Sequence, residues 1–154
     1  MLCLEALLLG GVRMTTKTTI SKKLTRNDLG TTGSHQAGVY VPINIIRLNF
    51  FPSLDSSQYN PRKTIPLLYK DKTVFFNLIY YNNRLFGKGT RNEYRLTGMT
   101  RFLKENNCKE NDVLEFSLCD GKYYIDIIKQ YTKELNIDAP IYIKSDWAYK
   151  ESIS

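Results

Sequence analysis

The chain has 154 residues, of which 42% are hydrophobic, which is enough for one domain with a buried core and argues against intrinsic disorder. Its 22 Lys and Arg residues outnumber its 15 Asp and Glu residues, and the resulting charge of +7 favours a polyanionic partner. Three cysteines without C-x-x-C spacing and a single histidine argue against a disulfide framework and a zinc site. We therefore expect a reducing, cytoplasmic setting, no cofactor and no membrane partner.

The first fourteen residues differ in character from the rest. They contain an apolar run, but no basic residue precedes it and Glu5 interrupts it, unlike a secretory signal peptide. We interpret residues 1–14 as an appended or mis-started segment that is disordered, with Met14 as an alternative start. Residues 15–154 are then expected to form a single domain.

Short elements separated by turn-rich sequence follow. A basic lead-in predicts a strand around Ser21–Thr25, and residues 27–34, with two glycines and several turn-forming side chains, predict a long loop. A brief strand is expected at Val39–Val41. Residues Ile43–Phe51, which lie between two prolines, predict a helix.

Two antiparallel hairpins are the clearest elements of the pattern. Thr64–Tyr69 and Thr73–Tyr81 are rich in β-forming residues on either side of a polar turn. Val113–Leu118 and Tyr123–Ile128 flank an Asp-Gly turn signal. Both pairs are therefore expected to form adjacent strands.

The remaining elements carry weaker signals. Met99, Phe102 and Leu103 fall on one helical face, which predicts a short amphipathic helix. Ile141–Ile143 is expected to add a last strand, and Trp147 to pack on the core or close the end of a barrel.

A basic stretch, R-L-F-G-K-G-T-R-N-E-Y-R, occupies residues 84–95 and contains only one acid, Glu93. Lys and Arg neutralise phosphates, and the guanidinium of Arg can grip guanine. Glu93 can accept from cytosine N4, and Asn92 can pair with adenine. The alternative interpretation is a solvated basic loop without a specific partner.

Three potential base readers alternate at the end of this stretch. In an extended segment Arg91, Glu93 and Arg95 would point to the same side. Three such readers would supply roughly 3–9 kcal/mol of discrimination, enough for a short specific site. Glu93 could instead pair with one of the arginines, which would orient that arginine in the free protein.

Two long motifs resemble one known family. L-T-R-N-D-L-G-T-T-G-S-H-Q-A-G-V-Y-V-P, at Leu24–Pro42, resembles the start of the N-terminal effector-binding domain of EcoRII-type restriction endonucleases, and Tyr80–Thr97 resembles a later DNA-contacting segment of that family. The segments P-x-x-I-I-R-L-x-F-F-P and R-F-L-K-E-N-N-C-K-E-N-D-V-L-E-F are similar to units of plant-type DNA-binding pseudobarrels. The resemblance covers about residues 22–130.

The resemblance implies a mainly β fold with short helices, an open seven-stranded DNA-binding pseudobarrel, over residues 15–154. Two arms would grip duplex DNA: a first arm, Lys23–Tyr40, and a second arm, Arg84–Arg95, which could extend to Arg101. Family positions imply DNA contacts from Lys23, His35, Tyr40, Lys88, Arg91, Glu93, Tyr94 and Arg95. We add as expected contacts Arg26, Gln36, Arg84, Asn92 and Arg101. The segment from Lys88 to Arg91 is one residue longer than the family motif, so the target sequence is not carried over.

Two expected contacts have a structural alternative. His35 could form a hydrogen bond within its own loop, and Tyr40 could be a packed barrel residue. The many tyrosines could also stack on the bases of a single strand, but the two arms favour a duplex.

The expected function is sequence-specific recognition of double-stranded DNA in the major groove, as the DNA-binding effector domain of a type II restriction system. The family also allows a separate nuclease subunit or domain as a partner. One alternative is a nuclease that cleaves DNA itself, which would need an acid followed by an acid-x-Lys set to hold Mg²⁺. No such set is found, so no catalytic or metal-binding residue is assigned, and whether the chain is an enzyme is left open. The other alternative is a nonspecific basic barrel that binds nucleic acid.

Overall fold

A computed structural model describes residues 15–33, 38–130, 142–143 and 146–153 of the chain. It contains short strands and two short helices in the order β1 (Thr16–Lys23), β2 (Val39–Val41), α1 (Ile43–Arg47), β3 (Arg62–Tyr69), β4 (Lys72–Tyr81), β5 (Glu93–Thr97), α2 (Thr100–Glu105), β6 (Val113–Cys119), β7 (Lys122–Ile128), β8 (Tyr142–Ile143) and β9 (Trp147–Ile153).

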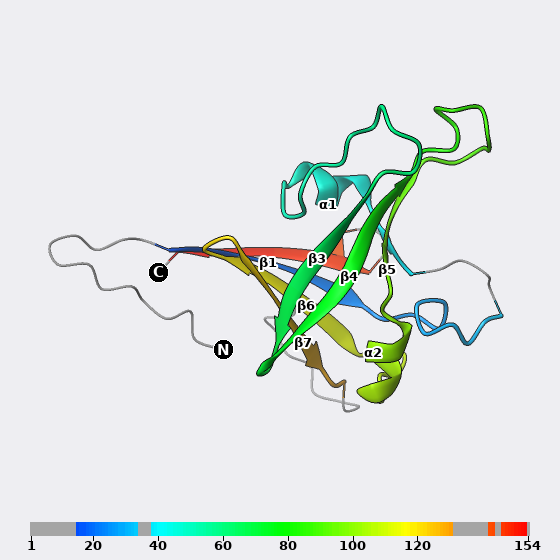
Figure 1. The fold of residues 1–154 in the computed structure, drawn as a ribbon. Coiled ribbons are helices and arrows are strands. Elements are labelled where there is room, and N and C mark those ends of the chain that lie inside the picture. The colour runs from blue at the N-terminus through cyan, green and yellow to red at the C-terminus, as the bar shows by residue number, and fades with distance from the viewer. Residues whose placement is uncertain (1–14, 34–37, 131–141, 144–145, 154) are drawn as a thin grey trace, which may run out of the picture.

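One curled sheet contains all the described strands (Figure 1). The strand order is β2-β5-β4-β3-β7-β6-β1-β9-β8, so β2 and β8 are its two edges and the barrel is open. The predicted mainly β, open pseudobarrel is therefore confirmed. The sheet has nine strands among the described residues instead of seven, because β9 and β8 extend it beyond β1.

Both predicted hairpins are present and antiparallel. Asp120 and Gly121, between β6 and β7, both have positive φ angles of 48° and 73°, as a two-residue type I′ turn requires. The two hairpins meet in a short parallel pairing in which Leu67 and Leu68 lie opposite Tyr123 and Tyr124. The sheet is therefore continuous from one hairpin to the other through this short parallel pairing.

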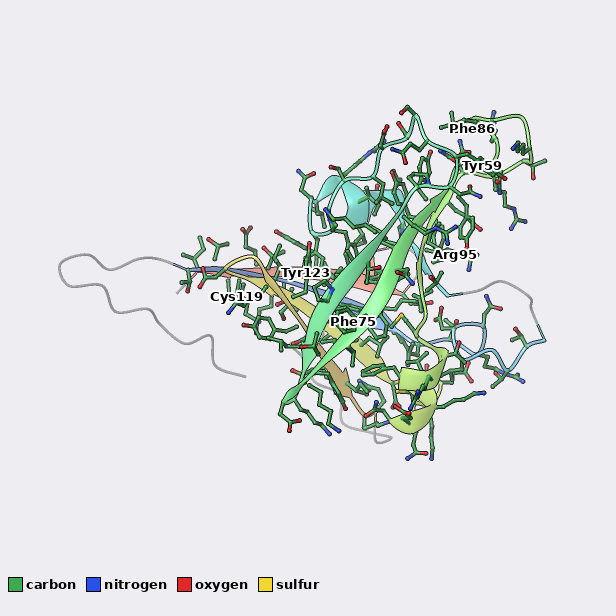
Figure 2. All side chains as sticks on the ribbon, viewed as in Figure 1. Tyr59, Phe75, Phe86, Arg95, Cys119 and Tyr123 are labelled. Carbon is green, nitrogen blue, oxygen red and sulfur yellow. The ribbon has the colours of Figure 1, made fainter. Side chains whose placement is uncertain are left out.

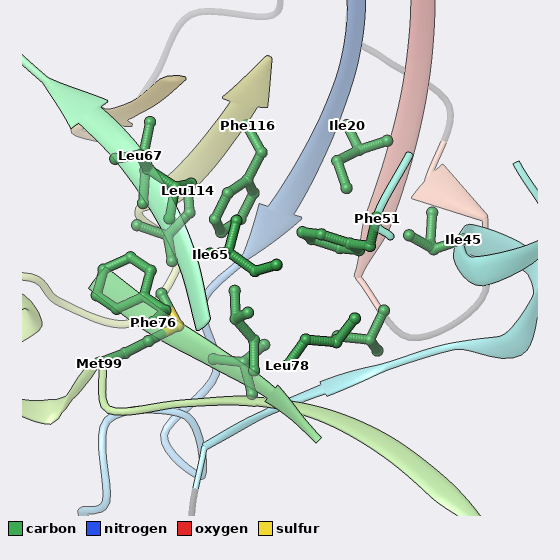
Figure 3. Close-up of a cluster of buried hydrophobic side chains, with 14 of the residues drawn as sticks. Ile20, Ile45, Phe51, Ile65, Leu67, Phe76, Leu78, Met99, Leu114 and Phe116 are labelled. Carbon is green, nitrogen blue, oxygen red and sulfur yellow. The ribbon is translucent and has the colours of Figure 1, made fainter. Parts of the chain in front are cut away.

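The hydrophobic core lies inside the curled sheet and is formed by alternate side chains of the strands. Figure 3 shows Ile65, Leu67, Phe76, Leu78, Leu114 and Phe116 converging with Phe51 and Ile45 from the α1 region. In α2, Phe102 and Leu103 are buried while Arg101 and Lys104 are exposed, which confirms the amphipathic helix. The two helices lie at opposite ends of the barrel (Figure 1).

Trp147 connects strands that are far apart in the sheet. It lies on β9, is fully buried and stacks on Phe116 with ring centroids 5.8 Å apart. Its indole N–H donates to the backbone oxygen of Tyr40 on β2, 3.0 Å away. The expectation that Trp147 packs on the core is confirmed. Its hydrogen bond to Tyr40 also connects β9 to β2 across the open side of the barrel, where no described strands pair.

Several boundaries differ from the prediction. β1 begins at Thr16, earlier than the strand predicted around Ser21–Thr25. The sequence of β1 has no apolar pattern, and the strand forms because it pairs with β6 on one side and with β9 on the other. α1 ends at Arg47 instead of Phe51, since Asn49 adopts a left-handed φ of 55°. The expected segment at residues 1–14 and the start of the last predicted strand, Ile141, lie outside the described residues.

The cysteines differ from one another. Cys108 is a free, half-buried thiol, and burial raises its pKa. Cys119, at the end of β6, is disulfide-bonded. The sequence argued against a disulfide framework, and the bond at Cys119 departs from that expectation.

The bridge from Trp147 gives a stability prediction. Trp147→Phe keeps an aromatic ring but removes the N–H, so the partly buried backbone oxygen of Tyr40 loses its donor. We expect the free energy of unfolding to fall by about 1–3 kcal/mol. Urea denaturation followed by circular dichroism measures it. Phe75→Ala is the control, since Phe75 is 62% exposed and its loss should change stability by less than about 0.5 kcal/mol; equal midpoints for the two variants would contradict the bridge.

Candidate nucleic-acid interface

The two arms leave the barrel on the same side (Figure 1). The first arm joins β1 to β2, and the second arm follows β4 and runs into β5. β2 pairs with β5, with Tyr40 opposite Arg95, so the ends of both arms lie next to each other in the sheet. The sheet therefore fixes where both arms emerge.

The second arm is a folded loop held by its own polar groups. The side-chain oxygen of Asn92 accepts from the backbone N–H groups of Arg84, at 3.0 Å, and Leu85, at 3.4 Å. The N–H of Lys88 donates to the backbone oxygen of Asn83 at 2.8 Å. These bonds use the backbone and leave exposed the side chains of Arg84, Lys88 and Arg91.

Asn92 differs from the expectation in one respect. Its side-chain oxygen already holds the loop in shape in the free protein. The contact of Asn92 with adenine stays a prediction. The Asn92 amide nitrogen would donate to the base, and the Asn92 side-chain oxygen would have to accept from the base as well as from the loop backbone.

Arg95 joins the two arms. Its Nε donates to Glu93 Oε1 at 3.0 Å and its Nη1 donates to the backbone oxygen of Gly38 at 3.2 Å. The Arg95 side chain is only 6% exposed and that of Glu93 is 20% exposed. The two side chains share one face of β5, as alternation requires. The pairing foreseen for Glu93 thus forms with Arg95, while Arg91 lies in the loop before the strand.

Gly38 makes this junction possible. Its φ is 80°, and a Cβ at this position would lie 2.4 Å from the backbone oxygen of Leu96. A residue with a side chain would have to push the end of the first arm away from β5. The short distance between the arms therefore depends on a glycine.

Tyr40 and Tyr94 lie on opposite faces of the sheet. Tyr40 is 38% exposed between Val39 and Val41, which are buried, so its ring lies on the outer face with Arg95. Tyr94 is half-buried and stacks on Tyr80 with centroids 4.2 Å apart. Burial, with a smaller contribution from Tyr80, raises the pKa of Tyr94. Of the two, Tyr40 is the more exposed.

A buried ion pair anchors the first arm. Lys22 Nζ lies 3.0 Å from Asp28 Oδ2, and their side chains are 5% and 7% exposed. Asp28 Oδ2 also accepts from the N–H and hydroxyl of Thr25, both at 2.8 Å. Because a buried charge is tolerated only with such partners, the turn at residues 25–28 is fixed to the barrel.

The other DNA contacts expected from the first arm, Lys23, Arg26, His35 and Gln36, differ in exposure and in whether the structure describes them. Lys23 is half-buried at the end of β1, and its backbone N–H donates to Asp146. Arg26 is exposed, and its backbone oxygen accepts from the N–H and hydroxyl of Thr31. His35 and Gln36 lie outside the described residues.

Arg101 stands apart from the second arm. It is exposed on α2, beyond the other end of β5, and pairs with Glu105 one helical turn away at 2.6 Å. This exposed pair raises the pKa of Arg101 through the hydrogen bond and charge of Glu105.

Sequence reasoning missed the residues that support the arms. Lys22 and Asn82 are buried polar residues at 4% and 0% exposure, and Gly38 makes the close approach. Tyr59, between α1 and β3, contacts Phe86 and Lys88 of the second arm. In the sequence these supporting residues are marked only by their polar neighbours in and beside the arm motifs, a pattern that a solvated loop would show equally well.

Comparison with known proteins places this geometry in a family. Residues 14–113, well over half of the chain, match the family model described as restriction endonuclease EcoRII, N-terminal. The chain belongs to this EcoRII N-terminal family. The match includes both arms and confirms the resemblance inferred from their motifs.

A curated relative of the EcoRII N-terminal family is the type II restriction enzyme EcoRII of Escherichia coli, which is 39% identical over 84 residues. The alignment covers 49% of this chain and 19% of that enzyme. No helix in the described part of the chain is long and apolar enough to cross a bilayer.

The junction at Arg95 gives a second stability prediction. Arg95→Ala would leave Glu93 and the oxygen of Gly38 without this partner, and we expect the free energy of unfolding to fall by about 1–3 kcal/mol. Arg91→Ala is the control because Arg91 is exposed, and a change below about 0.5 kcal/mol is expected. Thermal and urea unfolding measure both; an unchanged Arg95→Ala midpoint would show that the junction does not stabilise the arms.

Proposed function

We propose that this domain of the EcoRII N-terminal family recognises a specific sequence in double-stranded DNA, with both arms in the major groove, as the effector domain of a type II restriction system. One observation carries the proposal. Two arms on the same side of the barrel present the exposed cationic side chains of Arg26, Arg84, Lys88 and Arg91. Exposed cations on a common side suit the two phosphate backbones that border a groove.

The order within the arms supports specific readout. The second arm is held by Asn92, the first by the Lys22–Asp28 pair, and both by Arg95. A loop that is already ordered loses less conformational entropy on binding than a flexible one. The side chains that remain exposed therefore start from fixed backbone positions.

The proposed contacts fall into two groups. Phosphate contacts come from Lys23, Arg26, Arg84, Lys88 and Arg101, the last after exchanging its exposed partner Glu105 for a phosphate. Base contacts come from Arg91, which can grip guanine, with Asn92, Glu93, Tyr40 and, on the first arm, His35 and Gln36.

Arg95 and Tyr94 take a different part in the proposal. Arg95 would orient Glu93 and hold the first arm close, and its contact with a base would require the Glu93 pair to open. Tyr94 would support the second arm through its stack on Tyr80.

Selection of bound duplexes from a random pool tests the proposal directly. We expect one motif to be enriched. Arg91→Ala should then bind the motif and a scrambled duplex with more nearly equal affinity, losing about 1–3 kcal/mol of discrimination. Lys88→Ala should weaken both duplexes alike. Failure to enrich any motif would leave only a nonspecific basic barrel, and cleavage of plasmid by the purified chain with Mg²⁺ would favour the nuclease alternative.

Salt dependence tests the phosphate contacts. If these five phosphate contacts form, the logarithm of the binding constant should fall with the logarithm of salt concentration with a slope of roughly −4 to −5. Arg84→Ala should make the slope less steep by about one. Lys72→Ala is the control, because Lys72 begins β4 at the end away from the second arm and its loss should leave the slope unchanged. Equal slopes for all three proteins would contradict this assignment.

A further inference from the structure

A loop remote from both arms in sequence packs against the second arm. Residues 55–60, here called the brace loop, lie between α1 and β3. The side chain of Asn82, which is fully buried where β4 ends, donates to the backbone oxygens of Gln58, at 2.6 Å, and Ser56, at 3.3 Å. Its oxygen accepts from the N–H of Asn60 at 2.8 Å. One side chain thus fixes the brace loop to the base of the second arm.

Tyr59 extends this contact from the base of the arm to its tip. Its hydroxyl donates to the side-chain oxygen of Asn83 at 2.9 Å. Its ring meets Phe86 edge-on with centroids 5.4 Å apart, as Figure 2 shows at the outer end of the arm. Lys88 Nζ lies over the same ring, 4.2 Å from its centroid. Three different contacts therefore converge on one side chain.

The exposure of this cluster argues against a role in the core. Tyr59 is 44% exposed and Phe86 is 39% exposed, although both are large aromatic residues. Partly exposed rings add little to the stability of the barrel, but they restrict the positions that the loop and Lys88 can adopt. An ammonium has three donors and no fixed geometry of its own, so a cation over a ring is held in place with its donors still facing solvent.

We propose that Tyr59 is a positioning residue for DNA binding, which holds Lys88 and the Phe86 tip of the second arm where they meet the phosphate backbone of a duplex. The brace loop is then a third part of the DNA-binding apparatus, besides the two arms. This inference rests on the proposed function. It concerns a residue that does not itself have to touch the DNA.

A double-mutant cycle on the selected duplex tests the inference. Tyr59→Leu removes the ring face and the hydroxyl, and should weaken binding about five- to thirtyfold, the range expected for one aromatic and one cation–ring contact. Tyr59→Phe keeps the ring and should bind within about twofold of wild type. In a Lys88→Ala background the effect of Tyr59→Leu should shrink severalfold, because part of it acts through Lys88.

A second measurement requires no variant. In the wild-type protein the ε-methylene protons of Lys88 should be shifted upfield in NMR spectra by the ring of Tyr59. Random-coil shifts for these protons would overturn the inference even if Tyr59→Leu failed to fold. So would wild-type affinity for a folded Tyr59→Leu protein, or effects of Tyr59→Leu and Lys88→Ala that multiply independently.

Different results would contradict the proposed DNA-binding function and the role of Tyr59. If the wild-type chain enriches a motif but Tyr59 variants bind it normally, only the role of Tyr59 is lost. If the wild-type chain enriches no duplex and binds none, the proposed function is wrong and this inference is wrong with it.

Discussion

The buried guanidinium of Arg95 is the interaction on which the geometry of both arms depends. A buried charge needs partners, and Glu93 and the backbone oxygen of Gly38 both pair with this one. The pair fixes the start of β5, and the bond to Gly38 draws in the end of a segment that is remote in sequence. Because Gly38 has no side chain, the backbone just before β2 can lie against β5, and β2 then pairs with β5 with Tyr40 opposite Arg95. The spacing of the arms thus follows from one side chain and one glycine.

Buried polar groups also hold each arm at the place where it joins the barrel. Lys22 and Asp28 fix the first arm to the barrel, and Asn82 fixes the second arm to the brace loop. Such groups contribute little net stability, since their desolvation offsets much of their bonding. Their hydrogen bonds are directional, however, so they specify one conformation of a loop that could otherwise adopt many. The surface of the arms can then carry exposed cations on a defined backbone.

The parts of the fold that sequence predicted are the local ones. The two hairpins and α2 follow from patterns within a few residues, such as the Asp120-Gly121 turn and the apolar face of Phe102 and Leu103. β9 was missed, because its sequence, W-A-Y-K-E-S-I, has no regular alternation of apolar and polar residues and it is held by its pairing with β1, more than a hundred residues earlier. Similarly, the arm motifs indicated the proposed site, whereas the contacts of Asn82 and Tyr59 depend on a loop that only folding brings close to the second arm. Arg95 was assigned as a reader because alternation predicts the face of a side chain but not its burial.

The bond from Trp147 to Tyr40 has a practical consequence. Trp147 is the single tryptophan of the chain, so all its indole fluorescence comes from one buried position. The indole is bonded to the backbone of Tyr40, where the first arm rejoins the sheet, and the Tyr40 ring is partly exposed on the strand position opposite Arg95. The chain therefore contains an intrinsic optical reporter: a displacement of the arm would alter the polarity and hydrogen bonding around the indole, and so its emission, without any attached dye.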